Sequence, residues 1–217
     1  MTSENQTKQQ IIATVQSFSK NGLGVGTSGN LSARSEKGFF ITPTGVSYND
    51  LKPELLVELN EEGDVINGDL KPSSEWRFHR DIYLDRSEAG AIVHVHSPFA
   101  TAIACTRRSI PAFHYMIAIA GGDSIRCAEY GTFGTAELSI NVVKALEDRK
   151  ACLMSNHGII ALDKDIASAF KMALEVEELA KQYFYSLQIA EPVILDREEM
   201  QTNLEKFKTY GDQSQNK

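Results

Sequence analysis

The stretch Ala91-Ile-Val-His-Val-His-Ser-Pro-Phe-Ala-Thr-Ala-Ile-Ala104 combines the pattern of a buried strand with two imidazole side chains. The apolar residues predict a strand over 91–96, and Ser97-Pro98 is typical of the cap and first turn of a helix. Residues two apart in a strand project from the same face, so His94 and His96 should lie side by side, roughly 7 Å apart at Cβ. Two such imidazoles can bind one cation, although hydrogen-bonded core histidines would give the same pattern.

A cation site of this kind needs a third ligand, and the best candidate is His157. It follows the apolar stretch 151–156 and therefore lies at the end of an expected strand, where functional groups collect in layered α/β proteins. Glu75 and His79 stand four apart on an expected helix and offer an alternative carboxylate–imidazole pair. Spacing alone does not choose between them. Three imidazole nitrogens with a carboxylate or water suit Zn²⁺ or another borderline divalent ion.

Helices and strands alternate along the rest of the chain, which predicts a layered α/β domain. We expect helices over residues 11–21, 75–84, 98–104, 134–146 and 165–190. We expect strands over residues 39–41, 55–59, 65–66, 91–96 and 151–156, with 158–162 a short continuation of the last. Glu61-Glu-Gly-Asp64 supplies a turn between two of these strands, so part of the sheet should be antiparallel. The whole chain, 1–217, is predicted to be one domain with a mobile tail over 211–217.

Composition excludes several classes of function. The chain has 217 residues, of which 42% are hydrophobic, and its formal charge is -7 without a basic block, so nucleic acid is excluded as a partner. The start of the chain has no apolar leader and the most apolar run, 110–120, is too short to span a bilayer, so we expect a cytoplasmic protein without a membrane partner. Cys105, Cys127 and Cys152 are widely spaced and are expected to be reduced thiols.

Three short stretches are suited to binding an anion. Gly24, Gly26 and Gly29 spell G-x-G-x-x-G, but this motif follows a helix and lacks the Lys-Ser/Thr of a P-loop, which disfavours a nucleotide site. Glycines still allow backbone N–H groups to converge on an anion. Thr42-Pro-Thr-Gly45 and Pro72-Ser-Ser-Glu75, the latter at a helix N-terminus, have the same character, although each could be an ordinary turn or cap. Together they predict a pocket for a phosphomonoester.

Seven segments, taken together, resemble the class II aldolase/adducin family of metal-dependent enzymes and related scaffolds. They are Gly26-Thr-Ser-Gly-Asn-Leu-Ser32, Ile41-Thr-Pro-Thr-Gly45, Pro72-Ser-Ser-Glu-Trp-Arg-Phe-His79, Val93-His-Val-His96, Ser109-Ile-Pro-Ala-Phe-His-Tyr-Met-Ile117, Gly131-Thr-Phe-Gly-Thr135 and Asn156-His-Gly158. The likeness runs in register from the first helix to Glu205-Lys-Phe-Lys-Thr-Tyr-Gly211 and so covers nearly the whole chain. Val95 departs from the polar Asn expected between the paired histidines, which bears on aldehyde specificity rather than on metal ligation.

The resemblance implies a three-layer fold, in which a central, largely antiparallel sheet is flanked by helices, and one Zn²⁺ per subunit. It implies that His94, His96 and His157 bind the zinc, with Glu75 as fourth ligand and as the group that moves a proton. The residues implied to hold a substrate phosphate are Gly29, Asn30, Thr44, Gly45, Ser73 and Ser74. The family's aldolases are homotetramers with active sites at subunit interfaces, and Tyr115, Phe133 and Tyr210 match residues that complete the site, Tyr115 as a catalytic group.

The activity implied is reversible cleavage of a sugar phosphate, L-fuculose 1-phosphate or a similar ketose 1-phosphate, to dihydroxyacetone phosphate and L-lactaldehyde. Two other enzymes of the family remain alternatives, a methylthioribulose-phosphate dehydratase and a pentulose-phosphate epimerase. The epimerases place Asp where this chain has Glu75. A non-catalytic adducin-like interaction module is a third alternative, and the presence of all four metal-ligand candidates argues against it.

Overall fold

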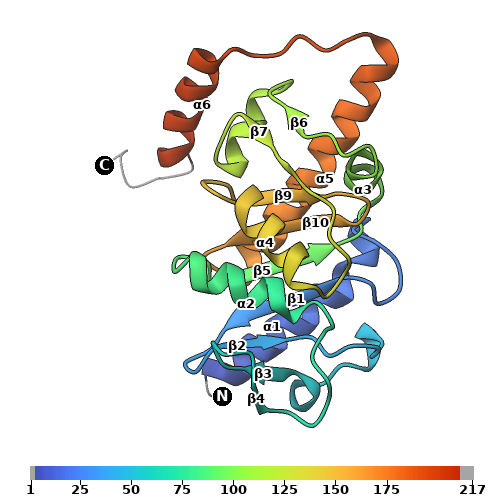
Figure 1. Ribbon diagram of the computed structural model, residues 1–217, viewed down its shortest axis with the longest axis vertical. Helices are drawn as coiled ribbons and strands as arrows, with labels where there is room; N and C mark the ends of the chain where they lie inside the picture. The colour runs from blue at the N-terminus through green and yellow to red at the C-terminus, as the bar shows by residue number, and fades with distance from the viewer. Residues whose placement is uncertain (1–2, 211–217) are drawn as a thin grey trace.

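The computed structural model describes residues 3–210, and its centre is an eight-stranded sheet in the order β4-β3-β2-β1-β5-β10-β9-β8 (Figure 1). The strands are β1 (Asn30–Arg34), β2 (Phe39–Ile41), β3 (Val57–Leu59), β4 (Val65–Asn67), β5 (Ala91–Val95), β8 (Cys127–Ala128), β9 (Ala151–Met154) and β10 (Gly158–Asp163). Neighbouring strands are antiparallel except for β8 and β9, which run parallel. The expectation of a largely antiparallel central sheet is confirmed.

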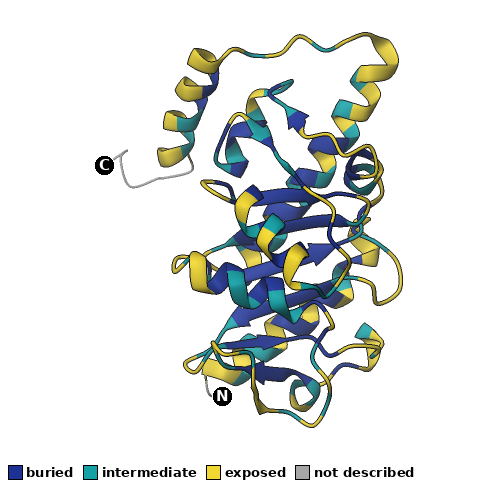
Figure 2. Ribbon diagram, viewed as in Figure 1, coloured by how far each residue is buried: buried dark blue, intermediate teal, exposed yellow. Residues whose placement is uncertain are grey.

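Helices cover both faces of this sheet and complete a three-layer arrangement (Figure 2). One face packs against α1 (Ser3–Ser17), α3 (Pro98–Ala104) and α5 (Ile166–Ile189), and the other against α2 (Trp76–Asp85) and α4 (Ala136–Ala145). Beyond the sheet, α6 (Arg197–Thr209) packs against the 3-10 helix η4 (Tyr115–Ala120), near a two-stranded sheet of β6 (Ile110–Pro111) and β7 (Ser124–Ile125). In the part of the chain that the structure describes, no helix is long and apolar enough to cross a membrane.

Side chains of β5 alternate between the two apolar cores. Ala91, Val93 and Val95 belong to the core under α1, α3 and α5, whereas Ile92 belongs to the core under α2 and α4. Because residues two apart share a face, His94 enters the α2 side, where its ring lies edge-on to Phe78 with centroids 5.5 Å apart. The first imidazole is therefore buried between the sheet and α2, while His96 lies one residue beyond the end of the strand.

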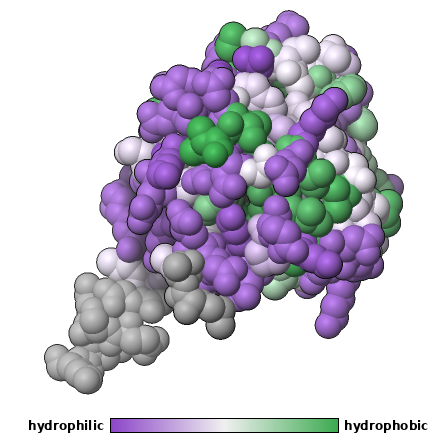
Figure 3. All heavy atoms as spheres, turned by 90° about the horizontal axis from the view of Figure 1, so that it is seen from below, coloured by the Kyte–Doolittle hydropathy of each residue, from purple (hydrophilic) through white to green (hydrophobic). Residues whose placement is uncertain are grey.

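The β4 end of the sheet is an exposed edge. Val65 and Ile66 are 46% and 42% exposed. Seen from this end, hydrophilic residues cover most of the surface and apolar ones gather in separate areas (Figure 3). The edge strand has only three residues, which leaves few free backbone groups for pairing with another chain.

Most expected elements are present, with shifted ends. The helix expected over 11–21 is α1 followed by a short 3-10 helix, and it ends at Gly22 in the left-handed region, φ 73°. The strand expected over 55–59 is shorter, because Pro53–Leu55 form a 3-10 helix. The tail expected over 211–217 lies outside the described residues.

One local expectation was wrong. Residues 158–162 do not continue the preceding strand, because the chain reverses at 155–157 and β10 pairs antiparallel with β9, with Gly158 opposite Met154. The helix expected over 75–84 begins at Trp76, with Glu75 at the cap position, and the hydroxyl of Ser73 accepts the N–H of Glu75 at 3.3 Å. The Glu75 carboxylate is directed toward the imidazoles of His94 and His157.

Candidate metal and substrate site

The end of β5 delivers the first two imidazoles. His94 is fully buried, and its Nδ1 donates a hydrogen bond of 2.9 Å to the carbonyl oxygen of Ile159 on β10. That bond fixes the orientation of the ring and leaves Nε2 as the nitrogen available to a ligand. The Nε2 atoms of His94 and His96 are 3.0 Å apart. The two side chains expected on one face of the strand therefore do converge.

The third imidazole comes from the turn between β9 and β10. Asn156 adopts a left-handed conformation, φ 55°, and His157 follows it at the tip of the hairpin. The next residue must be small, because a Cβ on Gly158 would lie 2.5 Å from the carbonyl oxygen of Val95 and 2.9 Å from Cδ2 of His96. Close approach of the hairpin to β5 thus brings His157 beside the first two rings, with ring centroids 4.9 Å from each.

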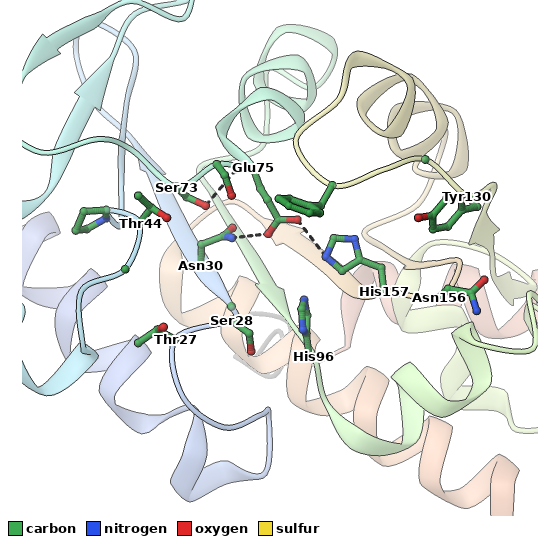
Figure 4. Close-up of a pocket in the computed structure, with 16 residues that line it drawn as sticks. Thr27, Ser28, Asn30, Thr44, Ser73, Glu75, His96, Tyr130, Asn156 and His157 are labelled. Atoms are coloured by element: carbon green, nitrogen blue, oxygen red, sulfur yellow. Dashed lines mark hydrogen bonds and ion pairs between the residues drawn. The ribbon is translucent and has the colours of Figure 1, made fainter.

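Glu75 closes this cluster from the start of α2. One carboxylate oxygen, Oε2, is 3.1 Å from Nε2 of His94, and the other, Oε1, is 3.1 Å from Nε2 of His157. Figure 4 shows the carboxylate directed toward His157, with a hydrogen bond to its other oxygen from the amide of Asn30. Glu75 is 6% exposed, and four ligand atoms from three separate segments thereby meet at one point.

The spacing of these atoms fits one small divalent cation. The candidate nitrogens of His94, His96 and His157 lie within 4.8 Å of one another. Around a tetrahedral ion with bonds of about 2.0–2.1 Å, ligand atoms are about 3.3 Å apart, close to the separations of 3.0 and 3.1 Å found here. These residues could hold a metal ion, and the donor set of three imidazoles and one carboxylate suits zinc.

His79, the alternative partner of Glu75, is not part of this cluster. Although His79 and Glu75 both face the sheet, the ring nitrogens of His79 contact Ser32 Oγ at 2.7 Å and Asn30 Oδ1 at 2.5 Å. Burial and the neighbouring charge of His94 lower the pKa of His79 to about 3, despite the opposing effect of Glu75, so this imidazole is neutral. His79 is therefore separated from the candidate ligands by Asn30, which contacts both His79 and Glu75.

Opposing effects set the charges within the cluster. Burial alone would raise the pKa of Glu75, but the charge of His94 and hydrogen bonds to His157 and His94 hold that pKa well below its ordinary value. Burial likewise disfavours protonated His94, yet the charge of Glu75 raises the pKa of that imidazole. Burial and the two neighbouring histidines lower the pKa of His96 to about 4. Glu75 is therefore anionic at neutral pH and His96 is a neutral, ligand-competent base.

A cleft of about 360 Å³ opens over this cluster, and all six residues expected to hold a phosphate line it. They are Gly29, Asn30, Thr44, Gly45, Ser73 and Ser74. Within the described chain the backbone N–H groups of Gly45 and Ser74 donate to no protein acceptor, and Ser74 lies at the N-terminal end of α2. Neither Lys nor Arg is among the described residues that line the cleft. This end of the cleft therefore offers neutral donors and a helix dipole to an anion.

Tyr130 and Asn156 lie at the other end of the cleft (Figure 4), and Phe133 also lines it. Arg107 lies behind it, because its Nε donates a 2.9 Å hydrogen bond to Asn156 Oδ1 and its guanidinium lies over the Tyr130 ring. Phe133 is implied by the family resemblance, whereas no sequence pattern indicated a site role for Tyr130, Asn156, Thr27 or Ser28, which also line the cleft. Asn156 and Arg107 both adopt left-handed backbone conformations, φ 55° and 58°, which are visible only in the structure.

Tyr115 and Tyr210 do not line this cleft. They lie near α6, where Tyr115 stacks on Phe207 with ring centroids 6.3 Å apart and both tyrosines border a separate hollow. Tyr115 is 49% exposed and Tyr210 is 79% exposed. Within a single chain, therefore, the two expected contributors remain apart from the metal-ligand cluster.

Comparisons with known proteins show the family of this chain. Residues 9–184 match the family model described as "Class II Aldolase and Adducin N-terminal domain". A 5-methylthioribulose-1-phosphate/5-deoxyribulose-1-phosphate aldolase of Rhodospirillum rubrum is 56% identical over 194 residues, which is 89% of this chain and 87% of that protein. The L-fuculose phosphate aldolase of Escherichia coli K12 is 49% identical over 208 residues, 95% of this chain and 96% of that protein.

Solved structures give the same result. A structure of an L-fuculose 1-phosphate aldolase superimposes with a TM-score of 0.91 and 41% sequence identity, covering 96% of this chain and 98% of the other. These relatives are aldolases, so the chain is a carbon–carbon lyase. On both the sequence match and the shared fold, it belongs to the class II aldolase and adducin family.

Proposed function

We propose that this protein cleaves a ketose 1-phosphate reversibly to dihydroxyacetone phosphate and an aldehyde. The observation that carries the proposal is the position of Glu75, whose carboxylate lies between the three histidines and a cradle of neutral anion donors in one cleft. A proton-transfer group, a cation site and a phosphate site are thus within the reach of one small substrate.

His94, His96 and His157 would hold one Zn²⁺ per subunit, with Glu75 as a fourth ligand that substrate displaces. A bound divalent cation supplies a positive charge that stabilises the enediolate left when the carbon–carbon bond breaks. No Schiff-base lysine is needed in such a reaction, and no lysine lines the described cleft.

Glu75 moves the proton. In the condensation direction the Glu75 carboxylate would remove a carbon-bound proton from dihydroxyacetone phosphate and become a carboxylic acid. In the cleavage direction Glu75 would first take a proton from solvent and then pass it, as the carboxylic acid, to the enediolate carbon. The low pKa of Glu75 in the cluster, caused by His94 and His157 against the effect of burial, keeps the carboxylate ionised until it is displaced. Loss of these contacts to the imidazoles would make it a stronger base at the step that needs one.

The phosphate would bind to the N–H groups of Gly45 and Ser74 and to the hydroxyl groups around them. The side chain of Asn30 is engaged differently from the expectation, since its Nδ2 donates to Glu75 Oε2 at 2.9 Å and its Oδ1 faces His79. Asn30 therefore supports the carboxylate through its side chain, and the residues on either side of it form the cradle.

L-fuculose 1-phosphate is the first candidate substrate, with L-lactaldehyde as its aldehyde product. The 56% identity to the Rhodospirillum rubrum protein favours a second candidate, 5-deoxyribulose 1-phosphate or its 5-methylthio analogue. All three share the half that becomes dihydroxyacetone phosphate and differ only in the aldehyde half. The end of the cleft at Tyr130 and Asn156 would contact the part that differs.

We further propose that the chain is a single aldolase domain that works as a homotetramer. Tyr115 and Tyr210, remote from the cleft of their own chain, would reach the site of a neighbouring subunit, where Tyr115 would exchange a proton with the aldehyde oxygen. Phe133, at the mouth of its own cleft and 66% exposed, would pack over the substrate at that interface.

The test is to incubate the zinc-loaded protein with each of the three ketose phosphates and to measure dihydroxyacetone phosphate with an NADH-linked reductase. Formation of dihydroxyacetone phosphate that ceases with a chelator is expected. A metal-replete protein that converts none of the three would refute the proposal, and consumption of the methylthio compound without dihydroxyacetone phosphate would indicate the dehydratase.

Glu75→Gln separates proton transfer from metal binding. The amide retains an oxygen ligand but cannot accept the proton, so turnover should fall by about 10²- to 10⁴-fold while most bound zinc is retained. Glu58→Gln is the matched control, because Glu58 is also buried but lies on β3, away from the cleft. Full activity of Glu75→Gln would remove Glu75 from the mechanism.

A further inference from the structure

Five polar side chains form one continuous hydrogen-bonded line that leads from the interior to Glu75. Tyr83 Oη is 2.8 Å from Ser32 Oγ, Ser32 Oγ is 2.7 Å from His79 Nδ1, His79 Nε2 is 2.5 Å from Asn30 Oδ1, and Asn30 Nδ2 is 2.9 Å from Glu75 Oε2. All five residues are buried. The candidate metal site and the proposed mechanism use only the last two of them.

The line alternates between two elements whose repeats match. Glu75 at the cap of α2 and His79 and Tyr83 within the helix are spaced four residues apart on one side, so they advance by about 6.0 Å per step. Asn30 and Ser32 are two apart on one face of β1, an advance of about 6.6 Å. A polar side chain of the strand therefore fits between each successive pair on the helix. Such a line through an apolar layer costs stability unless each member finds its partner.

The chemistry of the five groups allows one arrangement of protons. The Glu75 carboxylate only accepts, so Asn30 must present its NH₂ group to it and its oxygen to His79. His79 must then donate from Nε2, and because this imidazole is neutral, its Nδ1 accepts from the Ser32 hydroxyl. The Ser32 oxygen in turn accepts from Tyr83. Every hydrogen bond in the line is donated toward Glu75.

We propose that His79, Ser32 and Tyr83 are positioning residues that hold the Asn30 amide with its N–H directed at Glu75 Oε2 during turnover. A turn of that amide by 180° would place its oxygen against the carboxylate, and the Nε2–H of His79 prevents this turn. With Oε2 held, Oε1 is the oxygen that works on the substrate; in the described chain Oε1 lies 3.1 Å from Nε2 of His157. The inference rests on the proposed function in that Glu75 transfers the proton.

The first test measures the tautomer directly and needs no activity. In ¹⁵N-labelled, metal-free protein, long-range ¹H–¹⁵N spectra report which ring nitrogen of each histidine carries the proton, and His79→Gln assigns the signals. His79 should be protonated at Nε2 and unprotonated at Nδ1. A proton on Nδ1 would reverse the direction of the line and overturn the inference.

The second test uses two variants that differ in which nitrogen they mimic. The amide of His79→Gln lies near the position of Nε2 and can still donate to Asn30, whereas that of His79→Asn lies near Nδ1 and cannot. The readout is exchange of a carbon-bound hydrogen of dihydroxyacetone phosphate into D₂O without aldehyde, which isolates proton transfer. His79→Asn should lower the maximal exchange rate by about 10- to 100-fold, and His79→Gln should restore most of it.

The half-saturating concentration of dihydroxyacetone phosphate and the bound zinc should be unchanged in both variants. Equal losses in the two variants, no loss in either, or a loss of zinc would overturn a positioning role. Ser32→Ala, a smaller change, serves if the His79 variants do not fold, with an expected loss of about 2- to 10-fold and refutation by an unchanged rate. Absence of exchange in the wild type would count against the proposed function instead, and the tautomer measurement would still decide this inference.

Discussion

Replacing His79 by Gln should make the protein more resistant to mild acid. His79 is fully buried, and burial together with the charge of His94 lowers its pKa to about 3, against the opposing effect of Glu75. In the unfolded chain the pKa of the same imidazole returns to about 6.5. Glutamine cannot take up a proton in either state, so the variant removes this source of acid sensitivity.

The sign and size follow from the difference in proton uptake. Below pH 6.5 the unfolded chain binds a proton that the folded chain refuses until the pH approaches 3, so the free energy of unfolding falls through that window. The slope is about 1.4 kcal/mol per pH unit, and between pH 7.5 and 5.0 the group accounts for a loss of about 2 kcal/mol. The loss in His79→Gln over the same range should be smaller by that amount.

The assay is urea unfolding of wild type and His79→Gln at pH 7.5 and 5.0, with a chelator present throughout. Contributions from other titrating groups, including His96, cancel when the two pH-dependent losses are subtracted. The variant is expected to be less stable at pH 7.5, because its Ser32 contact is lost, yet to change less with pH. Identical losses in the two proteins would show that His79 titrates alike in both states, and the argument from burial would fail.

Three further changes probe the site and its supports. Divalent-cation affinity should fall as pH is lowered. Burial lowers the pKa of His94, but the charge of Glu75 and the hydrogen bond to it outweigh that effect and raise the pKa, so a proton must leave this imidazole when a cation binds. Calorimetry in buffers of different ionisation enthalpy would detect the release, and proton-free binding would contradict it. Gly134→Ala should raise the KM for the ketose phosphate, because at φ 76° its Cβ would lie 2.9 Å from the carbonyl oxygen of Ser74 in the phosphate cradle. Gly22→Ala is the control: it has a similar φ of 73° but no atom within 4 Å of its Cβ, so it should lower stability without changing KM. Equal KM values in the two variants would count against the cradle. Glu177→Ala should lower the free energy of unfolding by about 1–3 kcal/mol, because its carboxylate accepts hydrogen bonds from the N–H groups of Phe99 and Ala100. A smaller change in urea unfolding would show that water takes the place of the carboxylate.

Much of the fold could be predicted because its signals are local. The apolar periodicity of α5 and the Glu61–Asp64 turn each act within a few residues of the chain, and each is found where expected. The starts expected for α4 and α5 are also close to those found, because Thr135 and Asp165 cap these helices locally. The reversal at 155–157 could not be predicted in the same way. A tight turn at a non-glycine Asn156 depends on tertiary packing against β5, which local propensity does not record.

The candidate site likewise has one part that local sequence predicts and another that depends on the tertiary structure. Pairing of His94 with His96 follows from strand geometry, whereas the choice of Glu75 over His79 depends on where α2 begins. A cap one residue earlier or later would rotate the carboxylate away from the imidazoles, and the sequence predicts helix ends only approximately. Strand β1 was not predicted, because its residues 30–34 follow a glycine-rich loop and mix polar with apolar side chains. Because Asn30 and Ser32 lie on that strand, the hydrogen-bonded line from Tyr83 to Glu75 could not be predicted from the sequence.

The absence of Lys and Arg from the described lining of the cleft has a consequence for how the substrate specificity of such an enzyme can evolve. A grip formed by main-chain amides persists through most amino-acid replacements, because every residue except proline supplies the same N–H group. Under the proposed function, these backbone N–H groups bind the phosphate, which all ketose 1-phosphates share. Substitutions at Tyr130, Asn156 and Arg107 alone can then change which aldehyde the enzyme releases. Phosphate binding and carbon–carbon bond cleavage are retained, because they depend on other residues.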